Sequence, residues 1–141
     1  MTEITFYTFA DNPLDVARRV AVKAHGQGKQ VMIYAPDAAV ADAIDRLLWT
    51  TPALGFVPHC HDSDTLANET PVLIGADADA LRTADVMINL HTEQPAAFAR
   101  FERLVEIIGQ DDAGREQGRA RYRFYQARGY ALKTHDLRQT G

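Results

Sequence analysis

The fold is decided by residues 4–34, whose sequence is ITFYTFADNPLDVARRVAVKAHGQGKQVMIY. Residues 4–9 are rich in β-branched and aromatic side chains, which is typical of a strand. Asn12 and Pro13 favour a helix start, because asparagine caps a first turn and proline fits inside it. The apolar run 31–34 predicts a second strand, buried on both faces. A strand, a helix and a strand joined by short links predict a parallel α/β sheet.

The middle of the chain continues the alternation of helices and strands. Asp37 is a predicted cap for a second helix, which ends before Pro52. The apolar runs 71–75 and 85–90 predict two further strands. The polar stretch 59–70 between them is expected to be a surface loop.

The last third of the chain predicts two helices and a short strand. Pro95 is expected to start a helix with apolar positions at Phe98, Phe101, Val105 and Ile108. Asp111 or Asp112 can cap a last helix to about Arg128, before a strand at 130–134. We therefore predict one domain over residues 1–141, with a Rossmann-like three-layer α/β fold in which helices flank a mostly parallel sheet.

Charge is unevenly distributed along the chain. The protein has 141 residues and a net charge of −4, but residues 1–110 contain 8 Lys and Arg against 15 Asp and Glu, whereas residues 111–141 contain 7 against 4. A protein that is acidic overall is not suited to general nucleic-acid binding, since phosphate binding needs a dominant positive face. The basic C-terminal segment is therefore a candidate surface for an acidic partner.

Cysteine content and hydropathy indicate the compartment. The single cysteine, Cys60, excludes an intramolecular disulfide and is typical of a reducing environment. The first residues lack the basic and apolar regions of a signal peptide, and no apolar run reaches the ~18 residues of a membrane span. We expect a cytoplasmic protein that does not contact membranes.

The sequence contains no convincing catalytic, nucleotide-binding or metal-binding motif. The link after the first strand, residues 8–14, has no glycine-rich turn and no GxxxxGKS/T loop, so a phosphate-binding loop is not expected. Ser63 is the only serine and does not lie in a GxSxG turn. The run from His59 to Asp62 holds metal-ligand types, but adjacent side chains cannot all reach one tetrahedral ion or align as nucleophile and base. We therefore expect a non-catalytic protein without metal or cofactor.

The segment from Arg115 to Tyr130 contains five arginines and one glutamate. On a helix, one side would carry Arg115, Arg119, Tyr122 and Arg123. One interpretation is an exposed arginine face with the aromatic rings turned inward. Another is a cleft in which guanidinium groups bind carboxylates while rings line a pocket. A third is direct binding of single-stranded nucleic acid through base stacking and phosphate contacts.

The only tryptophan, Trp49, lies at the predicted end of the second helix and is followed by Phe56, Val57 and Pro58. These residues either cover the core or form an apolar patch for a partner, since tryptophan and phenylalanine serve as interface anchors.

Four stretches of the chain resemble the chi subunit of bacterial DNA polymerase III. They are Phe6-Tyr7, Leu48-Trp49 with Phe56-Val57-Pro58-His59, residues 85–90, and the terminal pattern from Arg119 to Leu132. They occur in the family's order and span nearly the whole chain. The resemblance implies a Rossmann-like fold without nucleotide chemistry, in a non-catalytic accessory subunit that acts with the clamp loader in DNA replication.

The resemblance also implies two protein partners, so that DNA would be reached only indirectly. One is the psi subunit, which would contact Trp49, Phe56, Val57 and Pro58. The other is the acidic C-terminal tail of the single-stranded-DNA-binding protein, which ends in proline and phenylalanine. Carried over by position, the tail site would consist of Ile108, Arg119, Tyr122, Arg123, Gly129 and Thr134.

Overall fold

A parallel sheet forms the centre of the computed structural model, which describes residues 2–50, 58–62, 64, 70–77 and 84–139. The described strands are β1 (Glu3–Ala10), β2 (Val31–Tyr34), β3 (His59–His61), β4 (Val72–Gly75), β5 (Val86–Asn89), β6 (Arg103–Gly109) and β7 (Leu132–Asp136). Their order across the sheet is β3-β4-β2-β5-β6-β1-β7, and every neighbouring pair is parallel. The predicted α/β fold is confirmed.

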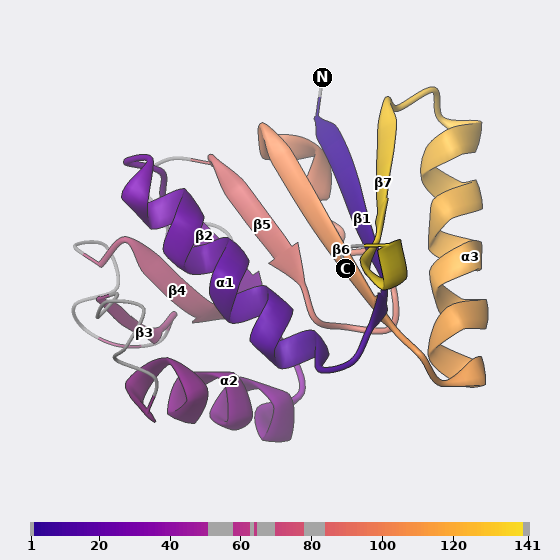
Figure 1. Ribbon diagram of the computed structural model, residues 1–141. Helices are drawn as coiled ribbons and strands as arrows, with labels where there is room; N and C mark the ends of the chain where they lie inside the picture. The colour runs from indigo at the N-terminus through magenta and orange to yellow at the C-terminus, as the bar shows by residue number, and fades with distance from the viewer. Residues whose placement is uncertain (1, 51–57, 63, 65–69, 78–83, 140–141) are drawn as a thin grey trace.

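Helices cover both faces of the sheet. α1 (Pro13–Gly26) and α2 (Ala38–Thr50) pack on one face, and α3 (Asp112–Ala127) packs on the other with the short 3-10 turn η4 (Phe98–Arg100). Figure 1 shows α1 and α2 on the near side of the sheet and α3 at the end where β1 and β7 lie. Strand residues alternate between the two cores: on β2, Val31 and Ile33 face α1 and α2, whereas Met32 faces the α3 side.

The chain leaves the neighbouring strands β1 and β6 in opposite directions. After β1, α1 leads to β2 on one face, and after β6, α3 leads to β7 on the other. Many α/β proteins bind ligands beyond the carboxyl ends of two such strands. Here side chains of the protein cap both helices: Asn12 accepts a hydrogen bond from the Asp15 N–H at 3.2 Å, and Asp111 accepts one from the Gly114 N–H at 2.8 Å. These N–H groups are therefore not available to a phosphate.

The helix predicted after Pro95 is wrong. Residues 98–100 form η4, and residues 103–109 form β6. The apolar positions from Phe98 to Ile108 are spaced by three or four, which favours a helix, but residues 104–108 are a nearly continuous apolar run and all are buried. Such a run suits a strand between two layers, and Val105 faces α1 while Leu104 faces the α3 side.

The surface loop predicted at 59–70 is wrong at its start. His59–His61 forms β3, a short edge strand that pairs with β4. Three residues are too few to show an alternating pattern, and short edge strands are common because they limit unwanted pairing. Residues 63 and 65–69 of this stretch lie outside the described residues.

Candidate functional site

A groove opens between α3 and the part of the sheet formed by β6, β1 and β7. Its volume is about 210 Å³. Alternate residues of β1 reach it because side chains two apart share a sheet face, and residues of α3 three or four apart form the opposite wall. The residues that line it are Phe6, Thr8, Phe9, Ile108, Arg115, Gly118, Arg119, Tyr122 and Thr134.

The groove brings together four of the six residues predicted for the tail site, namely Ile108, Arg119, Tyr122 and Thr134. The other two are not among its lining residues. Arg123 is exposed on α3. Gly129 follows the end of the helix with a φ of 82°, a conformation that favours glycine and terminates a helix.

The predicted site omitted β1 and two residues of α3. Phe6 and Thr8 show the alternation of a strand, but only the strand order places β1 beside β6 and β7. Arg115 belongs to the predicted arginine face but not to the predicted site. Gly118 carries no side chain, so nothing in the sequence indicates that it lines a groove.

The groove has apolar walls and basic residues. Phe6 is 2% exposed, and its ring meets the Tyr122 ring edge to face with 5.3 Å between centroids. Arg115 is half-buried and Arg119 is exposed. Neither makes an ion pair within the described part of the chain. An apolar recess beside two guanidinium groups of this kind suits a ligand that has an apolar group and a carboxylate.

Phe9, at the end of β1, is flanked by two arginines. The guanidinium carbon of Arg115 lies 4.9 Å from the ring centroid, and that of Arg138 lies 3.5 Å from it, both within cation–π range. The φ of Phe9 is 59°, and the pairing of β1 with β6 shifts register between Tyr7 and Ala10. A bulge of this type redirects a side chain, and here the ring becomes part of the groove wall.

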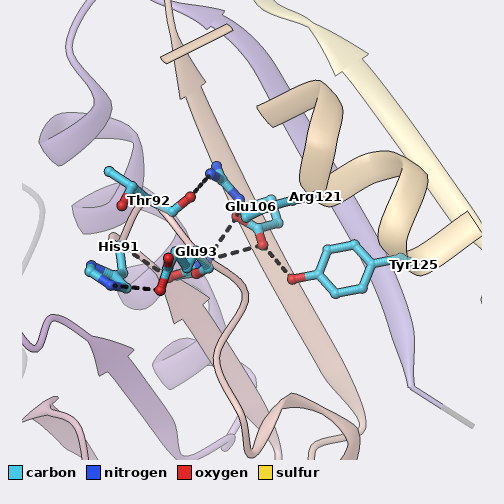
Figure 2. Close-up of polar contacts among 7 residues, drawn as sticks. His91, Thr92, Glu93, Glu106, Arg121 and Tyr125 are labelled. Atoms are coloured by element: carbon cyan, nitrogen blue, oxygen red, sulfur yellow. Dashed lines mark hydrogen bonds and ion pairs between the residues drawn. The ribbon is translucent and has the colours of Figure 1, made fainter. Parts of the chain in front are cut away.

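A buried polar network holds α3 against the sheet (Figure 2). Glu106 on β6 is 0% exposed and accepts hydrogen bonds from Arg121 Nε at 3.0 Å, Tyr125 Oη at 2.6 Å and Asn89 Nδ2 at 3.0 and 3.1 Å. Arg121 also donates to the carbonyl oxygen of Thr92 at 2.6 Å. Burial raises the pKa of Glu106, while the three donors oppose the shift. Arg121 and Tyr125 are therefore occupied in the core and are not part of the binding face.

Trp49 lies at the other end of the sheet. Its side chain is 57% exposed at the end of α2, and its ring centroid is 4.9 Å from that of His59 on β3. Leu48 beside it is 5% exposed and belongs to the core, so it is Leu48 and not Trp49 that anchors this turn of α2. Pro58 is exposed, and Phe56 and Val57 lie outside the described residues.

No cluster of three or more His, Cys, Asp or Glu in the described ranges could hold a metal ion. None of the helices in those ranges has both the length and the apolar character needed to cross a membrane.

A model of the family described as DNA polymerase III chi subunit, HolC, matches residues 1–133. The chain belongs to the DNA polymerase III chi subunit family. The resemblance found in the sequence is thereby confirmed, and the match to the chi family covers every groove residue except Thr134.

Curated chi subunits from three bacteria are similar over most of the chain. The DNA polymerase III subunit chi of Pseudomonas aeruginosa is 35% identical over an alignment that covers 97% of this chain and 98% of the relative. That of Haemophilus influenzae is 29% identical, with 94% of this chain and 95% of the relative covered. That of Escherichia coli is 28% identical, with coverages of 82% and 79%.

Proposed function

We propose that this chain is a non-catalytic accessory subunit of DNA polymerase III in replication, and that its groove binds the acidic C-terminal tail of the single-stranded-DNA-binding protein. The observation that carries the proposal is an apolar recess lined by two arginines that have no ion-pair partner within the described residues. Family membership supports the replication role, because the relatives are named as subunits of this polymerase.

The dimensions of the groove suit the end of such a tail. A dry cavity of ~150 Å³ holds one benzene molecule, so a groove of about 210 Å³ has room for one phenyl ring. The ring would pack between Phe6, Ile108 and Tyr122, and the terminal carboxylate would pair with Arg115 or Arg119. Because the tail is disordered before binding, its ordering offsets part of the interaction energy, and we expect micromolar affinity.

Trp49 supports a second site, for the psi subunit, which would link this chain to the clamp loader. A tryptophan that is 57% exposed at the end of a helix is a typical interface anchor. The psi site would include Trp49 and Pro58, together with Phe56 and Val57 from the sequence prediction. In this proposal the chain bridges its two partners.

Direct binding of single-stranded nucleic acid by the Arg115–Tyr130 segment is less well supported. Base stacking requires accessible rings, but Tyr125 is 0% exposed and the Phe124 ring is covered by the Arg128 guanidinium at 3.6 Å. Tyr122 lines the groove instead.

The proposal is tested by titrating the chain with fluorescent peptides that carry the acidic tail. We expect the full tail to bind and a peptide without the terminal phenylalanine to bind much more weakly. A single-stranded oligonucleotide should neither bind nor displace the full tail. Equal binding of both peptides would show that the groove does not receive the terminal ring, and tight oligonucleotide binding would favour the nucleic-acid alternative.

A further inference from the structure

Gly118 lies in the middle of α3, where glycine is unfavourable for a helix compared with alanine. A close contact with β6 accounts for its presence. A Cβ atom at Gly118 would lie 2.5 Å from Cδ1 of Ile108, 3.0 Å from Cγ1 and 3.2 Å from Cγ2. The helix and the strand are therefore so close here that a Cβ atom at residue 118 would require Ile108 to shift, because the end of Ile108 fills the space that the Cβ would take.

The same two residues line the groove. Ile108 is 6% exposed and packs in the core that contains Phe6 and Tyr125, so it has little room to move inward. Protein cores are packed as densely as organic crystals and resist an added methyl group. A methyl group at Gly118 would therefore displace the end of Ile108 toward the groove that both residues line.

We propose that Gly118 and Ile108 act as an interlocking pair that sets the depth of the groove and limits its ligand to one phenyl-sized side chain. This inference rests on the proposed function of the groove as a site for the acidic tail. The Gly118–Ile108 pair determines ligand size through packing alone, because neither residue has a side chain that carries a charge or makes a hydrogen bond. Recognition then has two separate parts, with the arginines selecting the carboxylate and the Gly118–Ile108 contact selecting the size of the terminal residue.

The experiment compares three variants, Gly118→Ala, Ile108→Val and the double variant, with acidic peptides that differ only in their last residue. Gly118→Ala should bind the peptide ending in phenylalanine about tenfold more weakly, as expected for overpacking by one methyl group. Ile108→Val removes Cδ1, which is the atom nearest the added methyl. The double variant should therefore recover binding to within about twofold of the unmodified chain. Ile108→Val alone should narrow the preference for phenylalanine over tryptophan.

A control variant separates an effect on helix stability from an effect on groove depth. Gln117→Ala adds no methyl group near β6, because Gln117 is exposed on the same helix, so it should leave peptide affinity unchanged. A peptide ending in alanine, which does not need the full depth, should bind Gly118→Ala and the unmodified chain equally. The melting temperature of each variant should be measured to check that its fold is retained.

The outcomes separate the inference from the proposed function. If the unmodified chain binds no peptide, the proposed function fails and this inference fails with it. If the unmodified chain binds the phenylalanine peptide but Gly118→Ala binds it equally well, or the double variant shows no recovery, only the interlocking pair is disproved.

Discussion

Tyr125 on α3 donates a hydrogen bond of 2.6 Å to Glu106 on β6, and both side chains are 0% exposed. Arg121, one turn earlier on the same helix, donates to the same carboxylate. Arg119 and Tyr122 lie on the helix that Arg121 and Tyr125 anchor to this carboxylate, so the buried contacts also fix the position of the groove wall. The residues that hold the site are thus distinct from those that line it.

Tyr125→Phe should lower the free energy of unfolding by about 1–3 kcal/mol, because it removes a donor from a buried carboxylate without changing the shape of the ring. Urea or guanidinium denaturation at neutral pH measures the change. Tyr130→Phe is a matched control, since the Tyr130 hydroxyl makes no hydrogen bond within the described residues and its ring contact with Phe98 is retained. Equal stability of the two variants would contradict the role assigned to the network.

Arg119→Ala should weaken binding of the acidic tail by about tenfold or more, as expected for loss of a charge-assisted hydrogen bond. Arg123→Ala, which removes an arginine that does not line the groove, should weaken it by no more than about twofold. Titrations at several salt concentrations measure both effects, and the affinity of Arg119→Ala should depend less steeply on salt. An equal loss in the two variants would indicate a diffuse basic face and not a groove.

Trp49→Ala should abolish binding of the psi subunit and leave tail binding unchanged. Because the Trp49 side chain is more exposed than buried, the melting temperature should change little. Leu48→Ala is the contrasting variant: its side chain is in the core, so it should lower the free energy of unfolding by about 2–5 kcal/mol. If Trp49→Ala binds the psi subunit as well as the unmodified chain does, the proposal of a second site at Trp49 is wrong.

Stability should depend on pH through Asp15, which forms ion pairs with Arg18 and Arg19 at the start of α1. The hydrogen bond from Arg18 lowers the pKa of the Asp15 carboxyl below its usual value. A lowered pKa means that the folded state favours the ionised form, so this stabilisation is present above the unfolded-state pKa and is lost as pH falls through the folded-state pKa. Asp15→Asn should therefore be less stable than the unmodified chain at neutral pH, by about 1 kcal/mol or less, because Arg18 is buried but the Asp15 carboxyl is still partly exposed to solvent. The two denaturation midpoints should converge in acid.

The sequence predicted the sheet well where a strand or helix had clear boundaries. Asn12 and Asp111 cap α1 and α3 as expected, and Pro13 lies in the first turn of α1. The apolar runs predicted as strands at 31–34, 71–75 and 85–90 contain β2, β4 and β5. The prediction failed at residues 95–109, because the phenylalanines have helical spacing while the following run is a buried strand. Periodicity alone cannot separate these two patterns.

The candidate site was only partly predictable, because sequence spacing indicates which residues share one helix face but not which elements pack together. Arg119 and Tyr122 are close in sequence, so helical spacing places them on one face. Two features depend on how α3 and β1 pack against β6: the contact of Gly118 with Ile108 and the left-handed backbone of Phe9. The local sequence cannot predict this packing. The burial of Arg121 could not be predicted from the sequence of α3, because its partner, Glu106, lies on β6.

The strand order has a consequence for the two proposed sites. Trp49 stands beside β3, whereas the groove is centred on β1, which is five strand spacings away. At ~4.8 Å per spacing the separation is roughly 24 Å. Ligands bound that far apart need not overlap, so we expect a ternary complex to assemble in either order. If neither ligand changes the conformation of the other's site, the two binding free energies should add. The sheet then serves as a spacer of fixed length between the two partners.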